Sequence, residues 1–388
     1  MDCRCKIWYN VSMKANFLSV GSIRTSDVGR HGPLPEKRRK LQDWVRSRIG
    51  TGVLRPGAIL PKRRWFCEKF KLAEHSVQRA FAELVDEGLL VAVSGHGTRV
   101  ADSLPFVGRF LMLLSVSRRD AGGIHFSPSL RAAASRVAVL RHVEFEFREL
   151  DNADRGSLEY AETLSEIRRQ RFAGVIAQSV TESEHGLDTV TNVDCVPIAF
   201  FGVKSEFTQG RMAIPFDIYG RDWELRLMDR HFAGLYKRGC RSVAVFKPFF
   251  AASGGQAALS KIAAKYAMSI VRNGYHTFDM HYWDSVQFGR WVDLFLASDA
   301  GRSADSVILG DDNMLMHFGE RYRRQFGSGA DGRYRISCHC NFPIVPECDL
   351  PVEFHGPDLV GAINSFVDYA ADCRAGLHRP RVPAIDAV

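Results

Sequence analysis

The sequence predicts a mixed α/β chain in which a small helical module precedes a larger region of parallel β-sheet. In the N-terminal quarter, two short amphipathic segments with helical periodicity are followed by a hairpin with glycines at its tip. After Asp102, short and almost continuously apolar segments alternate with helical stretches, which is the pattern of strands buried on both faces of a sheet. At 388 residues the chain exceeds what one compact core uses, so we expect two or three domains.

The chain begins with residues 1–32, whose weak periodicity predicts a mobile tail. A helix is then predicted over residues 35–49, because Pro35 suits a first helical turn. The basic run at residues 37–40 is expected on the exposed side of this helix. The apolar residues that recur at helical spacing, and so predict its buried side, are Leu41, Trp44, Val45 and Ile49.

The features of a winged helix-turn-helix follow one another in order within residues 33–102. A short apolar helix is separated from a second helix by a break at residues 71–73, and Gly88 ends the second helix. Gly95 and Gly97 then allow the tight hairpin that would form the wing. The buried stripe of the second helix is predicted to consist of Val77, Ala80, Phe81 and Leu84.

The excess positive charge of the chain lies with this module. Residues 1–102 hold nineteen Lys and Arg against ten Asp and Glu, a net charge of +9, whereas residues 103–388 hold thirty-three against thirty-four. This concentration favours a polyanionic partner such as the DNA backbone. A solvated basic surface is the alternative that the same count allows.

Residues 103–388 are predicted to form two parallel sheets joined by hinges, since they contain more strands than one small sheet would use. The predicted strands cover residues 110–116, 143–147, 174–177, 198–202, 243–246, 307–309 and 334–340. The predicted helices between them cover residues 129–139, 158–171, 223–238, 257–273 and 288–298, and a further helix follows residues 351–354.

The nine cysteines are scattered and odd in number, which is typical of reduced thiols in the cytoplasm rather than of a disulfide framework. Cys338, His339 and Cys340 alternate along a predicted strand, so the two cysteines share one face and His339 takes the other. Four zinc ligands cannot be assembled, and we expect neither a metal nor a cofactor. The sequence holds no apolar run of about 18 residues and no secretory signal, so no membrane span is expected.

An ordered set of residues within residues 34–100 points to a known family. Its members are Gly52, Pro56, Gly57, Leu60, Pro61, Arg64, Val77, Ala80, Leu84, Glu87, Gly88, Leu89, Gly95, Gly97, Thr98 and Val100. In this order and spacing they resemble the GntR family of bacterial transcription regulators. The resemblance implies that the helix starting near Glu74 enters the major groove of a double-stranded DNA operator, with its first turn against the base edges.

The same resemblance places candidate DNA contacts on the two helices and the wing. The candidate contacts are Arg64, His75, Ser76, Gln78 and the wing residue His96, and Lys62, Arg63 and Arg79 are candidate phosphate partners. Arg64 can contact guanine or clamp a phosphate, Gln78 can read adenine, and Gly97 allows the wing backbone to come close. Glu74 and Gln78 stand where the family commonly has basic residues, so the family's usual operator preference does not carry over. Glu74 would repel the backbone unless it accepts a hydrogen bond from cytosine N4. For each of these residues the alternative is an exposed polar side chain without a DNA role.

The larger region contains Asp217 with Gly220, the segment 307–312 and the segment 337–341, each at the end of a predicted strand or the start of a helix. These segments resemble the effector domain of the LacI family, which has a bilobed periplasmic-binding-protein-like fold with two parallel-sheet lobes. The resemblance implies a small-molecule site between the lobes, beyond the C-terminal ends of the strands. The candidate effector contacts are Asp311 and Asn341 on one lobe, and Ser117, Arg118 and Gln178 on the other.

A sugar effector is one candidate, together with related metabolites. Sugar-binding members of the LacI family place an arginine just after the strand equivalent to residues 243–246, and residues 252–257 contain none. This absence leaves two alternatives open, namely that the effector is anchored by other residues or that it has been lost.

The two resemblances together predict a DNA-binding transcriptional regulator, a repressor, that acts as a cytoplasmic homodimer under the control of a small-molecule effector. Arabinose-responsive regulators combine the same two parts. The alternative is a constitutive DNA-binding protein with a vestigial, ligand-free sensor domain. GntR-type modules are also found fused to aminotransferases, but the roughly 286 residues that follow are short for that fold. Because no nucleophile elbow, phosphate loop or metal-ligand cluster occurs either, we expect no enzymatic activity.

Overall fold

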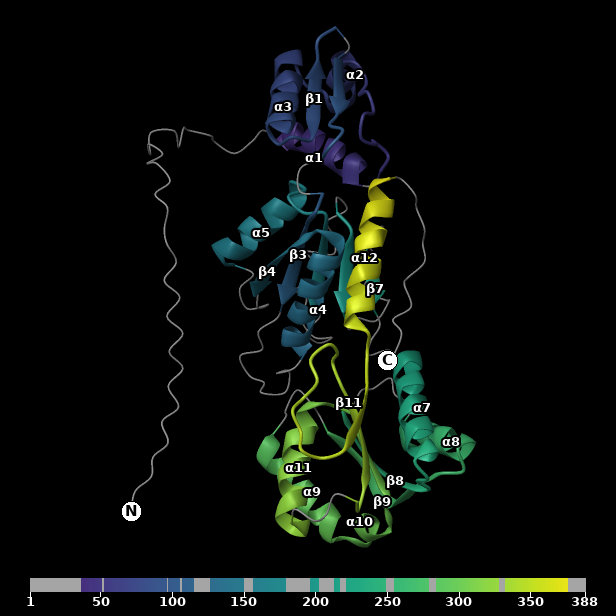
Figure 1. Cartoon of the computed structure of the whole chain (residues 1–388). Coiled ribbons are helices and arrows are strands. Elements are labelled where there is room, and N and C mark those ends of the chain that lie inside the picture. The colour runs from purple at the N-terminus through teal and green to yellow at the C-terminus, as the bar shows by residue number, and fades with distance from the viewer. Residues whose placement is uncertain are drawn as a thin grey trace, which may run out of the picture.

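The computed structural model of the chain consists of three bodies arranged one after another along the long axis of the molecule (Figure 1). A winged helix domain lies at one end, a lobe built on strands β3–β7 lies in the middle, and a lobe built on strands β8–β12 lies at the other end. We call these two lobes the N-lobe and the C-lobe. The structure describes residues 36–50, 52–95, 97–104, 107–114, 126–149, 156–178, 196–201, 213–216, 221–248, 255–278, 284–327 and 332–375. The expected tail at residues 1–32 lies outside them.

The winged helix domain has the element order predicted for it. Its elements are α1 (Glu36–Gly50), α2 (Arg63–Phe70), α3 (Glu74–Asp86), β1 (Leu90–Val93) and β2 (Gly97–Val100). The two strands pair antiparallel from Leu90 opposite Val100 to Val93 opposite Gly97, and Ile59 forms a bridge to Arg99. One apolar core joins the three helices and the hairpin, and it includes the predicted stripe of α3 and the buried face of α1.

One expectation for α1 is wrong, because Arg38 in the basic run at residues 37–40 is buried rather than exposed. The helix places Arg38 on the same side as Leu41, where it meets Glu83 of α3 at 3.7 Å. Arg46, two turns further on, makes two hydrogen bonds of 3.1 and 2.7 Å to the carboxylate of Glu87. Glu83 of α3 and Glu87, the residue that follows this helix, therefore hold two arginines of α1.

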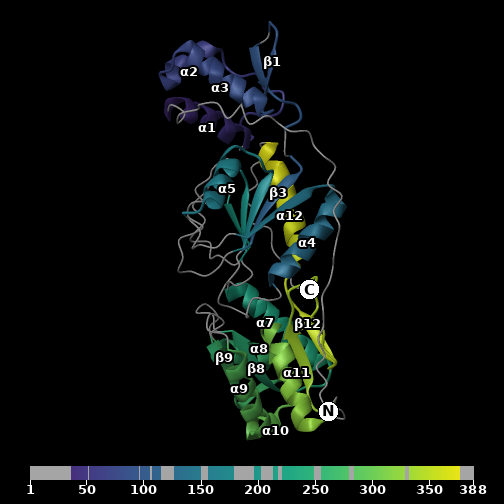
Figure 2. The same ribbon diagram turned by 90° about the vertical axis from the view of Figure 1, so that its left-hand side faces the viewer.

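The N-lobe is a five-stranded parallel sheet with helices on both faces (Figure 2). Its strands are β3 (Arg109–Leu114), β4 (Glu144–Glu149), β5 (Gly174–Gln178), β6 (Ile198–Phe201) and β7 (Ala213–Phe216), in the order β4-β3-β5-β6-β7. Successive residues of β3 face opposite sides. Phe110 and Met112 pack with α4 (Phe126–Arg141) and α12 (Leu359–Arg374), whereas Leu111 and Leu113 pack with α5 (Leu158–Arg168).

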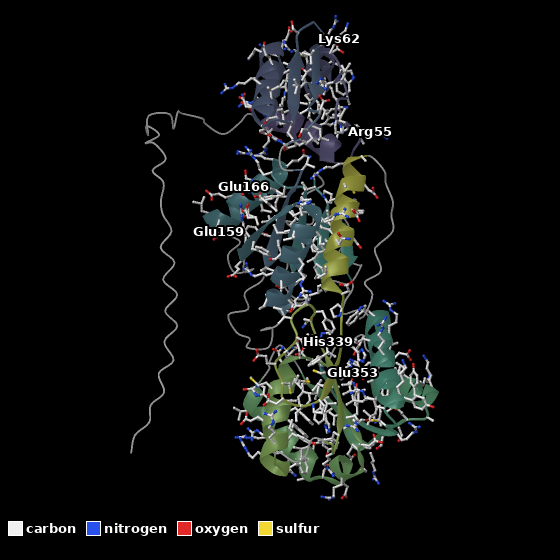
Figure 3. The ribbon with its side chains drawn as sticks, viewed as in Figure 1. Arg55, Lys62, Glu159, Glu166, His339 and Glu353 are labelled. Atoms are coloured by element: carbon white, nitrogen blue, oxygen red, sulfur yellow. The ribbon has the colours of Figure 1, made fainter. Side chains whose placement is uncertain are left out.

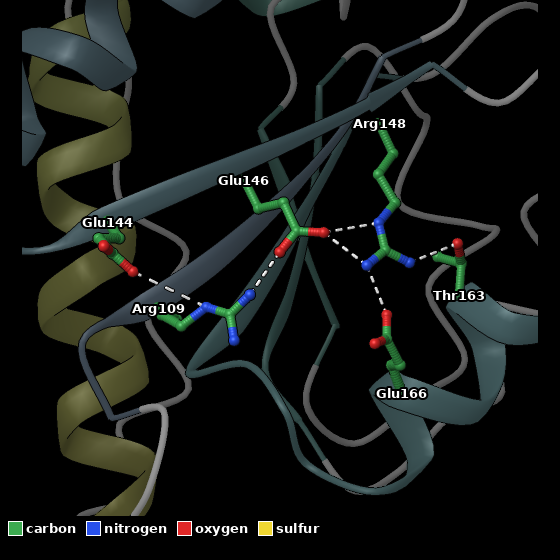
Figure 4. Close-up of polar contacts among 6 residues, drawn as sticks. All are labelled: Arg109, Glu144, Glu146, Arg148, Thr163 and Glu166. Atoms are coloured by element: carbon green, nitrogen blue, oxygen red, sulfur yellow. Dashed lines mark hydrogen bonds and ion pairs between the residues drawn. The ribbon is translucent and has the colours of Figure 1, made fainter. Parts of the chain in front are cut away.

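The edge strand β4 is covered by charged side chains (Figure 4). Glu146 accepts hydrogen bonds from Arg109 and Arg148, and Arg148 also bonds to Glu166 and Thr163 of α5. Burial acts to raise the pKa of Glu146, but the bonds from the two arginines hold it below its ordinary value. Charged groups along an edge strand hinder pairing with a strand of another chain, so this network protects the edge of the N-lobe.

The C-lobe repeats the same architecture. Its elements are α7 (Arg221–Lys237), β8 (Ser242–Pro248), α8 (Gly255–Lys265), β9 (Ser269–Phe278), α9 (Ser285–Ala297), α10 (Asp299–Ser303), β10 (Ser306–Leu309), α11 (Asn313–Phe326), β11 (Arg335–His339) and β12 (Val352–His355). The parallel strand order is β12-β11-β10-β8-β9, so in both lobes the first strand of the chain lies between the second and the third. After β12 the chain returns to the N-lobe as α12 (Figure 1). The prediction of two parallel sheets is confirmed.

The helix predicted over residues 257–273 is wrong in its second half. Helix α8 ends at Lys265, Ala267 adopts a left-handed conformation with φ of 50°, and β9 starts at Ser269 and pairs with β8. A register shift within this pairing interrupts the alternation of apolar residues that would have marked a strand. The sequence pattern also did not predict β7, β12, α10 and α11. The residues of β12 had been assigned to the segment that leads into the last helix. None of the helices in the described ranges is long and apolar enough to cross a membrane.

Candidate nucleic-acid interface and ligand cavity

The turn between α2 and α3 fixes how the second helix is presented. Lys71 ends α2 with φ of 52°, and the amide of Leu72 donates to the carbonyl of Cys67. Helix α3 then buries Val77, Ala80, Phe81 and Leu84 against the other two helices. Because these residues occupy one face, the opposite face of α3 is left in contact with solvent.

The predicted base-contact residues lie on that open surface. Glu74, His75 and Gln78 are exposed, and Ser76 is half-buried with its Oγ 3.2 Å from Nε2 of His75. Arg64 on α2 has a side chain that is 90% exposed, and its Nε donates to Glu68 at 3.0 Å. The guanidinium of Arg64 is therefore accessible and is oriented by an acidic neighbour one turn away.

The residues assigned to phosphates surround this surface. Lys62 and Arg63 are exposed at the start of α2, and Arg79 is half-exposed with its Nε 3.5 Å from Glu83. Lys62 lies at the end of the molecule that is farthest from the two lobes (Figure 3). Gly97 at the wing is exposed with φ of +87°, and a side chain there would meet no atom within 4 Å, so a groove could approach its backbone. His96 lies outside the described residues.

The base of the winged helix domain contacts the N-lobe. The buried side chain of Gln170, just after α5, donates a hydrogen bond to the backbone carbonyl of Arg46. Ile49 and Leu89 of the winged helix domain surround the same seam with Phe172 and Arg374 of the N-lobe. A direct physical connection thus runs from α1 to the end of α12.

A cavity opens in the C-lobe at the carboxyl ends of β8 and β10, where the strand order of the sheet reverses. In doubly wound sheets this reversal point is the usual place for a ligand. The cavity encloses about 490 Å³, its open side included. Its lining residues come from α7, β8, the segment after β10, and β11: Trp223, Glu224, Leu227, Met228, Lys247, Pro248, Gly310, Asp311, His339 and Asn341.

A buried ion pair forms one wall of the cavity. Lys247 at the end of β8 is 1% exposed, and its Nζ donates to Oε1 of Glu224 on α7. Burial raises the pKa of Glu224, although the charge and hydrogen bond of Lys247 oppose that rise. Gly310 keeps β10 close to β8, since a Cβ at this position would lie 2.8 Å from Cβ of Lys247.

Two sets of hydrogen bonds lie in and behind another part of the wall. Asp311 Oδ1 accepts from the backbone amide and the side-chain amide of Asn313 at 2.9 and 2.8 Å. Asp312 Oδ2 accepts from the side-chain amide of Asn341 at 3.0 Å, and Asn341 Oδ1 lies 3.3 Å from Nε2 of His339. Burial and the neighbouring charge of Asp312 raise the pKa of Asp311 to about 8, and burial lowers the pKa of His339.

These contacts fix the protonation of His339. Since the amide nitrogen of Asn341 donates to Asp312, its oxygen faces His339 and must receive a proton from Nε2. The neutral ring then carries a lone pair on Nδ1, a buried atom that has no partner within the described ranges. As predicted, His339 and Cys338 take opposite faces of β11: His339 lies edge-on to Trp223, while Cys338 packs in the apolar cluster of α9 and α11.

The structure brings two of the predicted effector contacts together. Asp311 and Asn341 line one cavity from neighbouring strands and are linked through Asp312. Gln178 ends β5 in the N-lobe, where it accepts a hydrogen bond from Ser127 at 2.8 Å, and it does not line this cavity. The positions of Ser117 and Arg118 lie outside the described residues.

Sequence reasoning missed the four other lining residues with polar side-chain atoms, which are Trp223, Glu224, Lys247 and His339. An arginine was expected among residues 252–257, whereas the cation of the cavity, Lys247, lies earlier, on β8 itself. A lysine that directly follows the apolar run at 243–246 was the available sign, because a charge on a buried strand needs a partner.

The Asp311→Asn variant is expected to remove a pH dependence of stability. Because the folded-state pKa of about 8 lies above the ordinary value of 3.8, folding retains a proton that the unfolded chain releases. This stabilising contribution is complete below the ordinary pKa and is lost as the pH rises to that of the folded state. Urea unfolding should therefore show the variant gaining free energy of unfolding relative to the wild type between these two pH values. If the difference in free energy of unfolding between the variant and the wild type did not change with pH, the raised pKa of Asp311 would be wrong.

Comparisons with known proteins identify the first domain. The family model "Bacterial regulatory proteins, gntR family" matches residues 37–100. The HTH-type transcriptional repressor NagR of Bacillus subtilis is 31% identical over 75 residues, which are 19% of this chain and 30% of NagR. The histidine utilization repressor of Klebsiella aerogenes is 36% identical over 63 residues, 16% of this chain and 26% of the repressor. The match thus spans about a third or less of each relative.

Among solved structures, a LacI regulator from Lactobacillus casei covers 74% of this chain and 97% of its own, with 12% identity and a TM-score of 0.47. The family match and the observed helix-turn-helix with its wing cover the same residues. Residues 37–100 are therefore a helix-turn-helix domain of the gntR family of bacterial regulatory proteins, joined in this chain to a bilobed α/β domain.

Proposed function

We propose that this chain is a transcriptional regulator that binds a double-stranded DNA operator through its gntR-type domain and changes its DNA affinity when a small molecule occupies the C-lobe cavity. The observation that carries this proposal is the combination of an open recognition surface on α3 with a polar cavity at the switch point of a doubly wound sheet. The relatives matched over the same domain are named as repressors, so we propose repression as the mode of action.

The cavity favours a working sensor over a vestigial one. Trp223, Glu224 and His339 line the cavity, and each has a buried polar atom with no hydrogen-bond partner among the described residues. Unsatisfied buried polar atoms cost free energy that a bound ligand would recover.

The seam between the domains offers a route from the ligand to DNA. Helix α12 follows the C-lobe strand β12, packs in the N-lobe, and ends with Arg374 beside Gln170 and the base of α1. A ligand that closes the two lobes would shift α12 relative to the C-lobe and so bias the position of the winged helix. Such coupling requires only that the ligand binds one closure state more tightly than the other.

We further propose that the regulator acts as a homodimer. Winged helix and helix-turn-helix proteins gain affinity and read longer operators when two copies occupy adjacent half-sites. The N-lobe helix α4 leaves Val139 and Leu140 exposed at 77% and 67%. Two large apolar residues next to each other on a surface helix are typical of an interface between copies.

The Arg64→Ala variant is expected to weaken operator binding by about 1–3 kcal/mol, because it removes a side chain that can make a bidentate contact with guanine or clamp a phosphate. An operator selected from random DNA, with binding followed by fluorescence anisotropy, provides the measurement. Arg324→Ala is the matched control, since Arg324 is also exposed and paired with a glutamate four residues away, but lies on the C-lobe. Unchanged binding by Arg64→Ala would show that the proposed docking of α2 and α3 is wrong.

A further inference from the structure

Acceptors outnumber donors among the buried atoms of the cavity lining that have no hydrogen-bond partner in the described part of the chain. Among these atoms, Oε2 of Glu224 and Nδ1 of His339 accept hydrogen bonds, and only Nε1 of Trp223 donates. These three residues are 6%, 7% and 5% exposed, so water from bulk solvent hardly reaches them. A ligand that satisfies these three atoms must bring two donors and one acceptor.

The charge of the cavity is also unbalanced. Three carboxyl groups lie in or directly behind its wall, those of Glu224, Asp311 and Asp312, against the single ammonium of Lys247. Lys247 is committed to Glu224, and the neutral ring of His339 adds no positive charge. The Asp311–Asp312 side of the cavity therefore carries acidic groups that no described cation compensates.

We infer that the effector of the proposed regulator is an organic cation bearing N–H donors, an ammonium or guanidinium compound, held between Asp311, Glu224 and His339. This inference rests on the proposed function and specifies the ligand class of the same cavity. A positively charged N–H group would supply donors to the vacant oxygen of Glu224 and the lone pair of His339, and would pair with an ionised Asp311.

A neutral sugar fits this wall less well. Its hydroxyl groups could satisfy the same acceptors, but they would leave two neighbouring carboxyl groups, Asp311 and Asp312, without a compensating charge. In the empty cavity that repulsion is relieved when Asp311 keeps its proton. A cation would instead displace this proton, so its binding should release a proton near neutral pH, whereas the binding of a neutral sugar should not.

Several charged and titratable groups surround Asp311 and must be considered in that proton balance. They are Asp312 on its own segment, Lys247 on β8, Glu224 on α7, and Cys338 and His339 on β11. The pKa of Cys338 is raised and that of His339 is lowered by burial, so neither is charged at neutral pH. Asp311 remains the group that can exchange its proton for a ligand cation.

The test is titration calorimetry of the full-length chain at neutral pH with agmatine, putrescine and methylguanidine as cationic probes and arabinose, ribose and galactose as neutral probes. Measurements in buffers of different ionisation enthalpy report the protons released. We expect at least one cationic probe to bind with proton release, and Asp311→Asn to weaken that binding at least about tenfold. This variant keeps one oxygen that can accept from Asn313 and replaces the ionisable carboxyl group by an amide that cannot pair with a cation.

Asp349→Asn is the matched control, because Asp349 is an exposed carboxylate of the same lobe, paired with Arg323, and should leave binding unchanged. Binding of a neutral sugar without proton release, or no binding of any cationic probe at millimolar concentration, would overturn the inference. The proposed function is tested separately by operator binding. If a sugar changed the operator affinity, the inference of a cationic effector would be wrong but the proposed regulator function would be supported. If a cationic probe bound and the chain bound no DNA, the cationic ligand would be supported and the regulator function refuted.

Discussion

The Phe66→Ala variant is expected to unfold the winged helix domain and abolish operator binding while the two lobes stay folded. Phe66 is 0% exposed and its ring meets those of Trp44, Trp65 and Phe81 with centroids 4.8–5.7 Å apart. Truncating a fully buried phenylalanine costs about 3–5 kcal/mol, because contacts are lost and a cavity remains. A domain of this size has only a few kcal/mol of stability to lose.

Hydrogen–deuterium exchange of the full-length variant measures this directly. Protection should fall across α1, α2 and α3 and stay unchanged across β8 and β10 of the C-lobe. Ile59→Ala is the control, since Ile59 is also a large apolar residue of this domain but is 68% exposed. If Phe66→Ala kept full protection in α3 and bound the operator normally, the aromatic cluster would not be what holds the helices together.

The parts of the fold that follow a regular pattern could be predicted from the sequence. The winged helix was predictable because its buried stripe, glycine stop and glycine hairpin are all local features within one short segment. Most strands of the two sheets were predictable because they are continuous apolar runs. Strand β9 was not, because its pairing with β8 shifts register and its residues also fit a helical period. Arg38 was misplaced because its burial depends on Glu83, 45 positions away.

The candidate site shows the same division. Asp311 and Asn341 could be predicted because each directly follows an apolar strand, and parallel strands end at one edge of a sheet. Glu224 and Trp223 could not, since nothing in a helical sequence tells which of its polar residues will face a cavity formed by other elements. Their role depends on where α7 packs against β8 and β11, which is a tertiary property.

The Lys247→Met variant is expected to lower the stability of the C-lobe by about 3–5 kcal/mol at neutral pH, because it leaves the carboxylate of Glu224 buried without its counter-charge. One oxygen of Glu224 already has no partner in the part of the chain that the structure describes, so the variant would leave both oxygens of the group without one there. The second substitution, Glu224→Leu in the same chain, should restore most of the loss, since an apolar pair in place of a buried ion pair is close to neutral.

The pH dependence separates loss of the charge pair from simple repacking. In the wild type burial raises the pKa of Glu224 while Lys247 opposes the rise, so removing Lys247 should raise it further. A carboxyl group whose pKa is raised by folding favours the folded state at low pH and loses this advantage as the pH rises through the folded-state value. In urea unfolding, the free energy of unfolding of Lys247→Met should therefore fall below that of the wild type. This difference should be smallest near the ordinary glutamate pKa of 4.5 and grow toward neutral pH. The double variant should show a small deficit at every pH. An equal deficit for Lys247→Met throughout would mean that the lysine contributes by the volume of its side chain and not by its charge.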